Sequence, residues 1–223
     1  MRIDILTLFP EMVSTVLSES IIGRAQSKGA VEINCVNIRD YTHDKHRRVD
    51  DYPYGGGSGM VMQAEPIYNA YKSLTEDGDK PLVLYMSPQG RVLDQSLVKE
   101  LADIPRLMVL CGHYEGVDER IIEEIVDMEV SLGDFVLTGG EIPAIALCDA
   151  VCRLVPGVLS RGECFADESH YNGLLEYPQY TRPPEFRGRR VPDVLLSGHF
   201  ANITKWRHEQ SLERTRQKRP DLL

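Results

Sequence analysis

Residues 107–116 read L-M-V-L-C-G-H-Y-E-G. The apolar run at 107–110 ends in a loop where two glycines flank polar and aromatic residues. A short apolar run of this kind, bounded by glycine, is typical of a strand that is buried on both faces. The same order of apolar run and polar loop recurs on both sides of this stretch.

The run at 82–85 is followed by M-S-P-Q-G, and a weaker run at 128–132 leads into S-L-G-D-F-V-L-T-G-G-E at 131–141. Helical patterns follow the runs, at 93–101, 117–126 and 141–155. This alternation predicts an α/β fold with a parallel sheet whose faces are covered. Ligands bind beyond the carboxyl ends of parallel strands, so the three loops are predicted to converge on one site.

Outside this region the patterns are shorter. Residues 3–8 and 31–38 predict strands, and helices are predicted after Pro10 and from Pro66 to Leu74. Residues 39–60 are polar without periodicity, and a loop of that length is uncommon in a compact domain unless it is functional or mobile. Residues 156–184 are rich in Gly, Pro and acids, which favours a linker, and a helical segment is predicted beyond it.

The net charge of −9 is unevenly distributed over the 223 residues. Between Arg182 and Arg219 ten Arg and Lys face four acids, a local +6, whereas the remainder holds fifteen basic residues against thirty acids, or −15. The asymmetry predicts that the basic C-terminal region binds a polyanion. The acidic remainder of the chain is predicted to have a different function. A solvated helical face with ion pairs between turns is the alternative on charge alone.

Five cysteines without a C-x-x-C pair favour reduced thiols over a disulfide framework or a zinc site. Cys148 and Cys152, four residues apart, are expected to be buried small hydrophobic groups. The N-terminal residues lack an apolar run of signal-peptide length, and the most apolar stretch, 142–159, contains Asp149, Arg153 and Pro156. We expect a cytoplasmic protein with no membrane span and no bound metal.

The glycine-rich stretch at 131–141 restricts the kind of ligand. Glycines let a backbone come close to a ligand, but a phosphate cradle would add a Lys and a helix N-terminus. Here the charged neighbours are Asp134 and Glu141, without Lys or Arg, and the chain contains neither G-x-G-x-x-G nor a P-loop motif. A neutral or cationic ligand is therefore predicted.

Four stretches stand out in consistent order along the chain: R-D-Y-T-H-D-K-H-R-R-V-D-D-Y-P-Y-G-G-G-S-G-M at 39–60, C-G-H-Y-E-G-V-D-E-R at 111–120, S-L-G-D-F-V-L-T-G-G-E-I-P-A at 131–144 and L-L-E-Y-P-Q-Y-T-R-P at 174–183. Together they resemble the TrmD family of bacterial tRNA (guanine-N1)-methyltransferases in the SPOUT superfamily. The resemblance implies a homodimer with the active site at the subunit interface. It also implies a SPOUT domain at 1–160 with a deep trefoil knot at about 85–145, a linker at 161–184 and a small all-helical tRNA-binding domain at 185–223. Residue patterns alone predict an ordinary open sheet, because knots are rare.

The cofactor that the resemblance implies is S-adenosylmethionine, a sulfonium cation with a neutral adenine and no phosphate. The positions that match the family's cofactor contacts are Gly112, Leu132, Gly133, Asp134, Phe135, Val136 and Leu137. The pocket wall is expected to be completed by Tyr85, Met86, Ser87, Pro88, Tyr114, Glu115, Gly139, Gly140 and Pro143. The sequence departs from the family at His113, where an Arg is frequent, and at Phe135, where a Tyr is frequent.

The implied reaction is methyl transfer to N1 of guanine 37 in the tRNA anticodon loop, next to guanine 36. The N1 proton must leave and charge builds on O6, so a carboxylate base and an Arg are needed. Arg153 matches the family's arginine. Glu168 stands at the position of the base and is preferred because the alignment then needs no gap, and Asp167 just before it is the alternative.

Two regions are expected to contact RNA. The loop at 41–60 is expected to read the guanine before the target and to contact phosphate, through His46, Asp50, Gly55, Gly56, Gly57 and Gly59. Basic residues near the C-terminus are expected to hold phosphates of the tRNA, namely Lys205, Arg207, Arg214 and Arg216. A methyltransferase for another RNA position or a ribose hydroxyl, and a non-catalytic RNA-binding module, are the other hypotheses.

Overall fold

The computed structural model of the chain describes residues 1–76, 78–159, 165 and 168–223. The chain divides into two compact units, Met1–Ser160 and Arg161–Leu223. No helix among the described residues is long and apolar enough to cross a bilayer.

The first unit is built on a five-stranded sheet. Its strands are β1 (Arg2–Thr7), β2 (Glu32–Asn37), β5 (Leu82–Val92), β6 (Arg106–Cys111) and β7 (Met128–Ser131), in the order β2-β1-β6-β5-β7. All neighbouring strands are parallel, so the predicted parallel α/β fold is confirmed.

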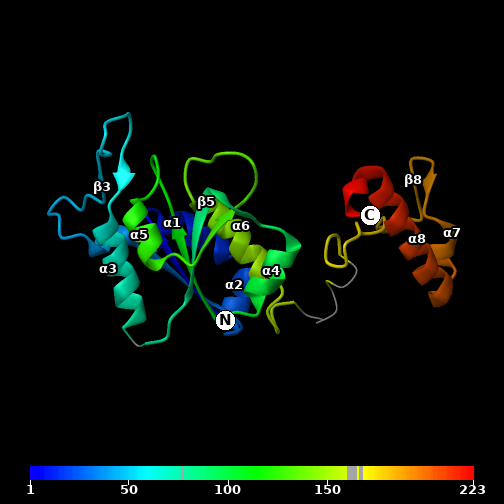
Figure 1. The fold of residues 1–223 in the computed structure, drawn as a ribbon. Helices are drawn as coiled ribbons and strands as arrows, with labels where there is room; N and C mark the ends of the chain where they lie inside the picture. The colour runs from blue at the N-terminus through cyan, green and yellow to red at the C-terminus, as the bar shows by residue number, and fades with distance from the viewer. Residues whose placement is uncertain (77, 160–164, 166–167) are drawn as a thin grey trace. The chain divides into compact units, whose positions relative to one another are not determined.

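Helices cover both faces of this sheet (Figure 1). One face shares its core with α1 (Pro10–Leu17), α2 (Ser20–Ser27), α4 (Gln95–Ala102) and α6 (Glu141–Cys152). The other face packs on η1 (Ile38–Tyr41), α3 (Ala64–Thr75) and α5 (Glu119–Ile125). Side chains alternate between the two cores along β6, which explains why its sequence is an unbroken apolar run.

Two segments differ from the sequence expectation. The stretch M-S-P-Q-G, predicted as a loop, lies inside β5, where Met86 and Arg91 both pair with Val130 and the residues between them bulge out. Pro88 cannot donate a ladder hydrogen bond, so it fits only at such an irregularity. The stretch at 39–60, predicted as a loop, contains β3 (Asp50–Asp51), which pairs antiparallel with β4 (Val61–Met62) just after it.

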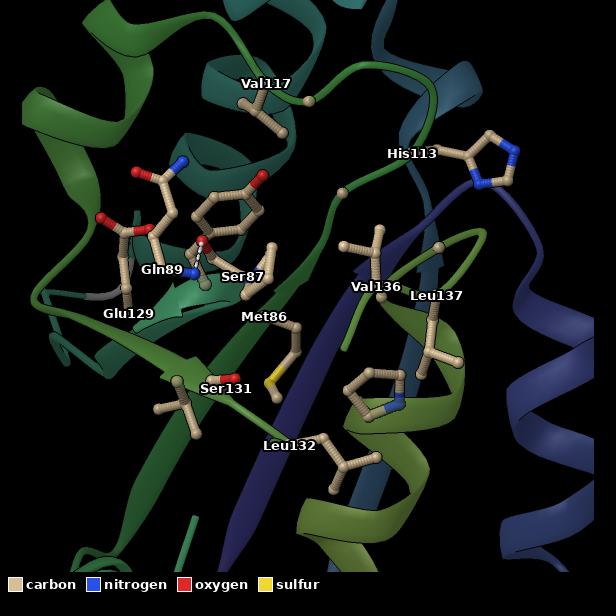
Figure 2. A pocket seen from close by; sticks show the side chains of 18 of the residues that line it. Met86, Ser87, Gln89, His113, Val117, Glu129, Ser131, Leu132, Val136 and Leu137 are labelled. Carbon is tan, nitrogen blue, oxygen red and sulfur yellow. Dashed lines mark hydrogen bonds between the residues drawn. The ribbon is translucent and has the colours of Figure 1, made fainter. Parts of the chain in front are cut away.

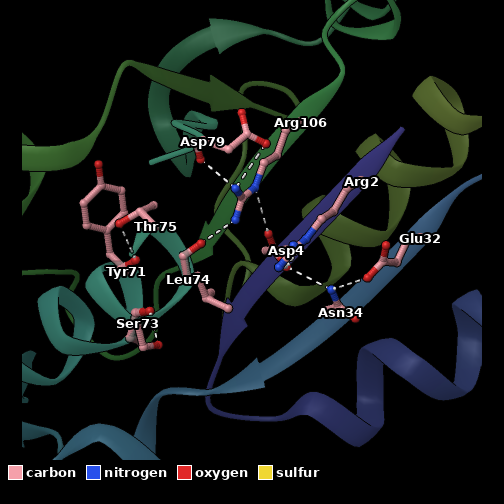
Figure 3. A network of polar contacts seen from close by, with 11 residues as sticks. Arg2, Asp4, Glu32, Asn34, Tyr71, Ser73, Leu74, Thr75, Asp79 and Arg106 are labelled. Carbon is pink, nitrogen blue, oxygen red and sulfur yellow. Dashed lines mark hydrogen bonds and ion pairs between the residues drawn. The ribbon is translucent and has the colours of Figure 1, made fainter. Parts of the chain in front are cut away.

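A buried ion pair holds the amino-terminal edge of the sheet (Figure 3). Arg106 and Asp4 are 4% and 0% exposed, and Arg106 Nε lies 3.5 Å from Asp4 Oδ2. The guanidinium also donates to the carbonyl oxygens of Leu74 and Asp79, and Asp4 Oδ1 accepts from Asn34 Nδ2 at 3.0 Å. The network ties the turn after α3 to β1 and β6, at the edge away from the glycine-rich loops.

The second unit is smaller and contains β8 (Glu185–Phe186), β9 (Arg189–Arg190), α7 (Asp193–Leu196), α8 (Phe200–Lys218) and η2 (Pro220–Leu222). It is mostly helical, but β8 and β9 form an antiparallel hairpin that the sequence reading did not anticipate. Part of the stretch predicted as a linker packs on α8: Leu175 N–H donates to Thr215 Oγ1 at 2.9 Å, and Arg207 stacks over the Tyr177 ring at 4.7 Å.

Candidate functional site

A pocket of about 330 Å³ opens at the carboxyl edge of the sheet (Figure 2). The bulge of β5, the loop after β6, the loop after β7 and the start of α6 all contribute to its wall. In Figure 2, Gln89 and Glu129 lie on one side of the pocket, and Val136 and Leu137 lie on the other. The three loops predicted to converge on one site therefore do so.

The pocket collects most of the residues that the sequence nominated for a cofactor. The nominated residues in its wall are Tyr85, Met86, Ser87, Pro88, Gly112, Tyr114, Glu115, Leu132, Phe135, Val136, Leu137, Gly139, Gly140 and Pro143. Gly133 and Asp134, both described, are not among the lining residues. Their loop therefore contributes to the wall through Leu132 and through residues from Phe135 onward.

Sequence reasoning missed further wall residues, among them Gln89, Glu119, Ile122 and Glu129. Glu129 alternates with apolar neighbours along the predicted strand, which could have placed it on the pocket side. Glu119 and Ile122 are in α5, the helix that follows the loop after β6. Because they follow that loop closely in the sequence, they could have been predicted as wall residues.

Two glycines let the loops approach each other closely. A Cβ at Gly140 would lie 2.7 Å from Cys111 Cα and 2.9 Å from the Gly112 nitrogen, so backbone fills the space that a side chain would need. The Gly140 N–H donates to the Gly112 carbonyl oxygen at 2.8 Å. A Cβ at Gly112 would in turn come within 2.8 Å of the Tyr85 hydroxyl. The pocket floor is thus a backbone-to-backbone contact between loops that are 28 residues apart in the sequence.

Tyr85 is a buried polar group of the wall. Burial, together with the negative charges of Glu129 and Glu119, raises the pKa of its phenol to about 12. The hydroxyl is therefore protonated at physiological pH and can donate a hydrogen bond to a ligand.

The charge of the wall favours a cation. Glu115, Glu119 and Glu129 line the pocket, and its described lining contains no Lys or Arg. Carboxylates attract a positive group, and without a basic side chain a phosphate has no charged partner. The observed wall agrees with the ligand class predicted from the glycine-rich stretch.

A buried hydrogen bond fixes the start of α6 to the end of β1. Glu141 is 3% exposed, and its Oε1 accepts from Thr7 Oγ1, at the end of β1, at 2.8 Å. Thr7 Oγ1 also accepts from the Phe9 N–H at 2.9 Å. This pair joins the end of β1 to the helix N-terminus that carries Gly140 and Pro143 into the pocket wall.

The loop nominated for RNA recognition adjoins the pocket. The Glu115 N–H donates to the Met60 carbonyl oxygen at 3.0 Å, and the Met62 N–H donates to that of Gly116 at 2.9 Å. A Cβ at Gly59 would come within 2.4 Å of Glu115 Oε1, so the glycine run meets a pocket carboxylate. Glycines 55, 56, 57 and 59 all have positive φ, and His46, earlier in the same loop, is exposed.

Arg48 orders the basic part of the same loop. It donates two side-chain hydrogen bonds to Asp44, which hold the pKa of that half-buried carboxyl well below its usual range. Asp50 begins β3 and is half-buried. The loop therefore carries ordered polar groups beside the pocket.

Of the nominated catalytic residues, Arg153 lies outside the wall of this pocket in its own chain. Arg153 caps the carboxyl end of α6, whereas Gly140 and Pro143 line the pocket at the other end. Arg153 follows Pro143 by ten positions along the helix, about 15 Å along the axis and more than an arginine side chain reaches. Glu168 belongs to the second unit, and Asp167 lies outside the described residues.

The basic residues nominated on α8 are engaged inside the second unit. Arg207 stacks on Tyr177, and Arg214 Nη1 donates to the Glu176 carbonyl oxygen at 3.3 Å. Lys205 Nζ lies 3.9 Å from Glu209. Arg216, also nominated, pairs with Glu213 at 3.1 Å. Each of these four side chains therefore contacts a group of its own chain, although a tRNA phosphate was the expected partner.

Known proteins resemble this chain over its whole length. The profile of the family described as tRNA (Guanine-1)-methyltransferase TrmD matches residues 1–223. The tRNA (guanine-N(1)-)-methyltransferase of Ruminiclostridium cellulolyticum is 65% identical over 100% of this chain and 96% of the relative, and that of Clostridium botulinum strain 657 is 60% identical over 100% and 92%. The crystal structure of tRNA (m1G37) methyltransferase from Aquifex aeolicus is 46% identical, covers 99% of this chain and 93% of its own, and superposes with a TM-score of 0.81. The chain belongs to the tRNA (guanine-1)-methyltransferase TrmD family.

Proposed function

We propose that this enzyme transfers a methyl group from S-adenosylmethionine to N1 of guanine 37 in tRNA that carries guanine at position 36. The observation that supports the donor is the pocket wall, which has three carboxylates and no described Lys or Arg. The similar Aquifex aeolicus protein is a tRNA (m1G37) methyltransferase, which supports the acceptor.

The pocket residues fit S-adenosylmethionine. A neutral Tyr85 hydroxyl and the backbone groups around Gly112 and Gly140 can bind an uncharged adenine, and the wall carboxylates suit a sulfonium. When bound, this donor supplies an electrophilic methyl group whose bond to sulfur breaks as the bond to guanine N1 forms. Glu168, or Asp167, would take the N1 proton, and Arg153 would stabilise the charge on O6.

The position of Arg153 supports a site built from two chains. It lies at the far end of α6 from the pocket of its own chain. Large apolar side chains are exposed on the loop after β7, on α1 and its N-cap residue, and on α6: Phe9 is 42% exposed, Met12 44%, Val16 52%, Val136 80% and Ile142 48%. Exposed apolar groups of this size favour an interface, and a two-fold dimer could bring Arg153 of one chain to the pocket of the other.

Three features complete the proposal. The family resemblance supports a trefoil knot over about 85–145, and the contact between the loop after β7 and the loop after β6 is compatible with it. The proposed linker at 161–184 joins a methyltransferase domain to a tRNA-binding domain at 185–223, and its later part, at 175–177, packs on that second domain. A tRNA substrate gives the protein a cytoplasmic location.

Position and reaction are tested with transcripts. Full-length protein is incubated with labelled S-adenosylmethionine and tRNA transcripts that carry G or A at position 37, and the methylated base is located by nuclease digestion. We expect N1-methylguanine at position 37 of the G transcript only. Label on the A transcript, or on a ribose, would refute the assignment.

The composite site is tested by mixing variants. Arg153→Ala and Gly140→Ala are each expected to be inactive alone, because one removes the charge near O6 and the other closes the pocket. If the site uses two chains, subunit exchange restores one intact site per mixed dimer, or about a quarter of wild-type sites at equal mixing. No recovery, with exchange shown by mass spectrometry, would place Arg153 in its own chain's site.

A further inference from the structure

The β8–β9 hairpin differs from α8 in whether its basic side chains form ion pairs with acidic residues. Arg187, Arg189 and Arg190 lie on a six-residue hairpin whose residues are all exposed. No described carboxylate forms an ion pair with these three arginines. Glu185 pairs with Arg190 across the backbone ladder without a side-chain ion pair. On α8, by contrast, Lys205 and Arg216 face acids of their own helix, and Arg219, the residue after α8, pairs with Asp221 at 2.6 Å.

The turn of the hairpin holds an arginine in a costly conformation. Arg187 has φ 51° and Gly188 has φ 77°, the signs that a two-residue type I′ turn requires. Asn, Asp or Gly is preferred at the first of these positions, because other L-residues pay about 1–2 kcal/mol for a left-handed backbone. A residue kept in such a conformation at an exposed tip suggests that its side chain has a use.

The hairpin is closed at its base by a backbone hydrogen bond and carries one exposed aromatic residue. The Val191 N–H donates to the Pro184 carbonyl oxygen at 2.9 Å and closes the base. The Arg187 guanidinium lies over the Phe186 ring, 5.5 Å from its centroid, while the ring stays 65% exposed. The cation is thereby oriented by an apolar platform, and its N–H donors are not used by a carboxylate.

We propose that this hairpin, rather than α8, is the main phosphate-binding element of the second unit, and that Arg187, Arg189 and Arg190 contact the sugar-phosphate backbone of the substrate RNA. The identity of that RNA as tRNA rests on the proposed function. Three guanidinium groups within four residues, none in an ion pair with a described carboxylate, each offer the two-donor fork that a phosphate accepts. An arginine already paired with an acid must first lose that partner.

The test is the salt dependence of tRNA binding by the full-length protein. The triple variant Arg187→Asn, Arg189→Gln, Arg190→Gln keeps the turn, because Asn tolerates positive φ. Binding is measured by fluorescence anisotropy between about 50 and 200 mM salt. We expect the slope of log K against log salt to fall by about 2 to 3, since each lost phosphate contact removes about 0.7 to 0.9. Affinity at low salt should fall by about tenfold or more.

Two further proteins make the result interpretable. Arg219→Gln removes one cation that already has a partner in Asp221, so its slope should match that of the wild type. Replacing all three hairpin arginines by Lys keeps the charge and should restore most of the slope. An unchanged slope in the triple variant, or an equal loss in Arg219→Gln, would overturn the proposal.

The experiment distinguishes a failure of the hairpin proposal from a failure of the proposed function. If the wild-type protein binds tRNA with the expected slope and the triple variant loses it, the hairpin is an RNA site even where no methyl transfer is found. If methyl transfer to guanine 37 is found and the slopes are equal, the enzyme assignment remains and the hairpin assignment fails.

Discussion

The two units of the chain hold their functional side chains by different means. In the first unit, buried apolar residues pack on both faces of the sheet, and the pocket loops hydrogen-bond to each other through their backbones. Among the described residues of the second unit, only Ser211 and Thr215 are buried. A change in the first unit should therefore deform a rigid site. A substitution in the second unit should remove only the contacts of the substituted side chain.

Gly140→Ala should give the largest effect, because its Cβ would overlap the backbone of Cys111 and Gly112. Backbone on both sides cannot move without shifting the pocket floor, and a displacement near 1 Å can cost about 100-fold in rate. We expect donor binding by calorimetry and methyl transfer each to fall by about 100-fold or more.

The matched control is Gly173→Ala in the second unit. Gly173 has φ 80° and open space around it, so alanine meets backbone strain without overlap and should cost about 1–2 kcal/mol. Donor binding should be unaffected. If both substitutions weaken donor binding equally, close packing of the loops is not what shapes the pocket.

The buried ion pair gives the second largest effect. Asp4→Ala removes the carboxylate beside Arg106 at a site where both side chains are buried, and breaking such a pair typically costs about 3–5 kcal/mol. Arg106 still has a second ion-pair partner in Asp79, 3.3 Å away, so we expect a loss of stability at the lower end of that range. Chemical denaturation of the full-length protein measures the loss.

Arg91→Ala provides the contrast within the same unit. Arg91 pairs with Glu100 at 2.8 Å, but both side chains are about half exposed, and such pairs contribute about 1 kcal/mol or less. A loss in Arg91→Ala as large as that in Asp4→Ala would mean that burial does not set the strength of these pairs.

The sequence predicted the first unit well because its signals are local. Each apolar run at 82–85, 107–110 and 128–132 became a strand of the parallel sheet, and their loops met at one edge. The glycines and acids of 131–141 excluded a phosphate before any geometry was known, and the pocket wall has the charge expected from them. These conclusions depend on composition and order, which a single sequence contains.

Features set by distant contacts were not predictable. Pro88 argues against a strand, so the bulge in β5 was read as a loop, although pairing with β7 resumes at Arg91. The F-R-G-R turn places an arginine where hairpins prefer Asn or Gly, and its two-residue strands are too short for a periodic signal. The charge of α8 was visible in the sequence, but the partners of Arg207 and Arg214 depend on how 175–177 folds back.

Thr215→Val tests the weaker cohesion of the second unit. Thr215 Oγ1 accepts from the Leu175 N–H at 2.9 Å and donates to the Ser211 carbonyl oxygen at 2.7 Å. Valine keeps the shape but leaves the Leu175 N–H without its acceptor, a loss of about 1–3 kcal/mol. We expect faster amide exchange at 175–177 and unchanged exchange in β6. Slower exchange at 175–177, or equal changes in both units, would show that Thr215 does not fasten this segment.

The smallest effect is a change in stability with pH that the cysteines of the first unit should produce. Burial raises the pKa of Cys35 to about 11 and of Cys152 to about 12, and it raises that of Cys148 well above its ordinary value of 9.0. A group whose pKa is raised on folding stabilises fully below its unfolded pKa. Stability should therefore be level to about pH 9 and fall above it, because the thiols then ionise only in the unfolded chain. Cys148→Ala removes one such thiol, so the stability deficit of this variant relative to the wild type should be about 1.4 kcal/mol smaller at pH 10 than at pH 7 in denaturation curves. A deficit that stays constant over this range would mean that Cys148 can ionise in the folded core, contrary to a tightly packed first unit.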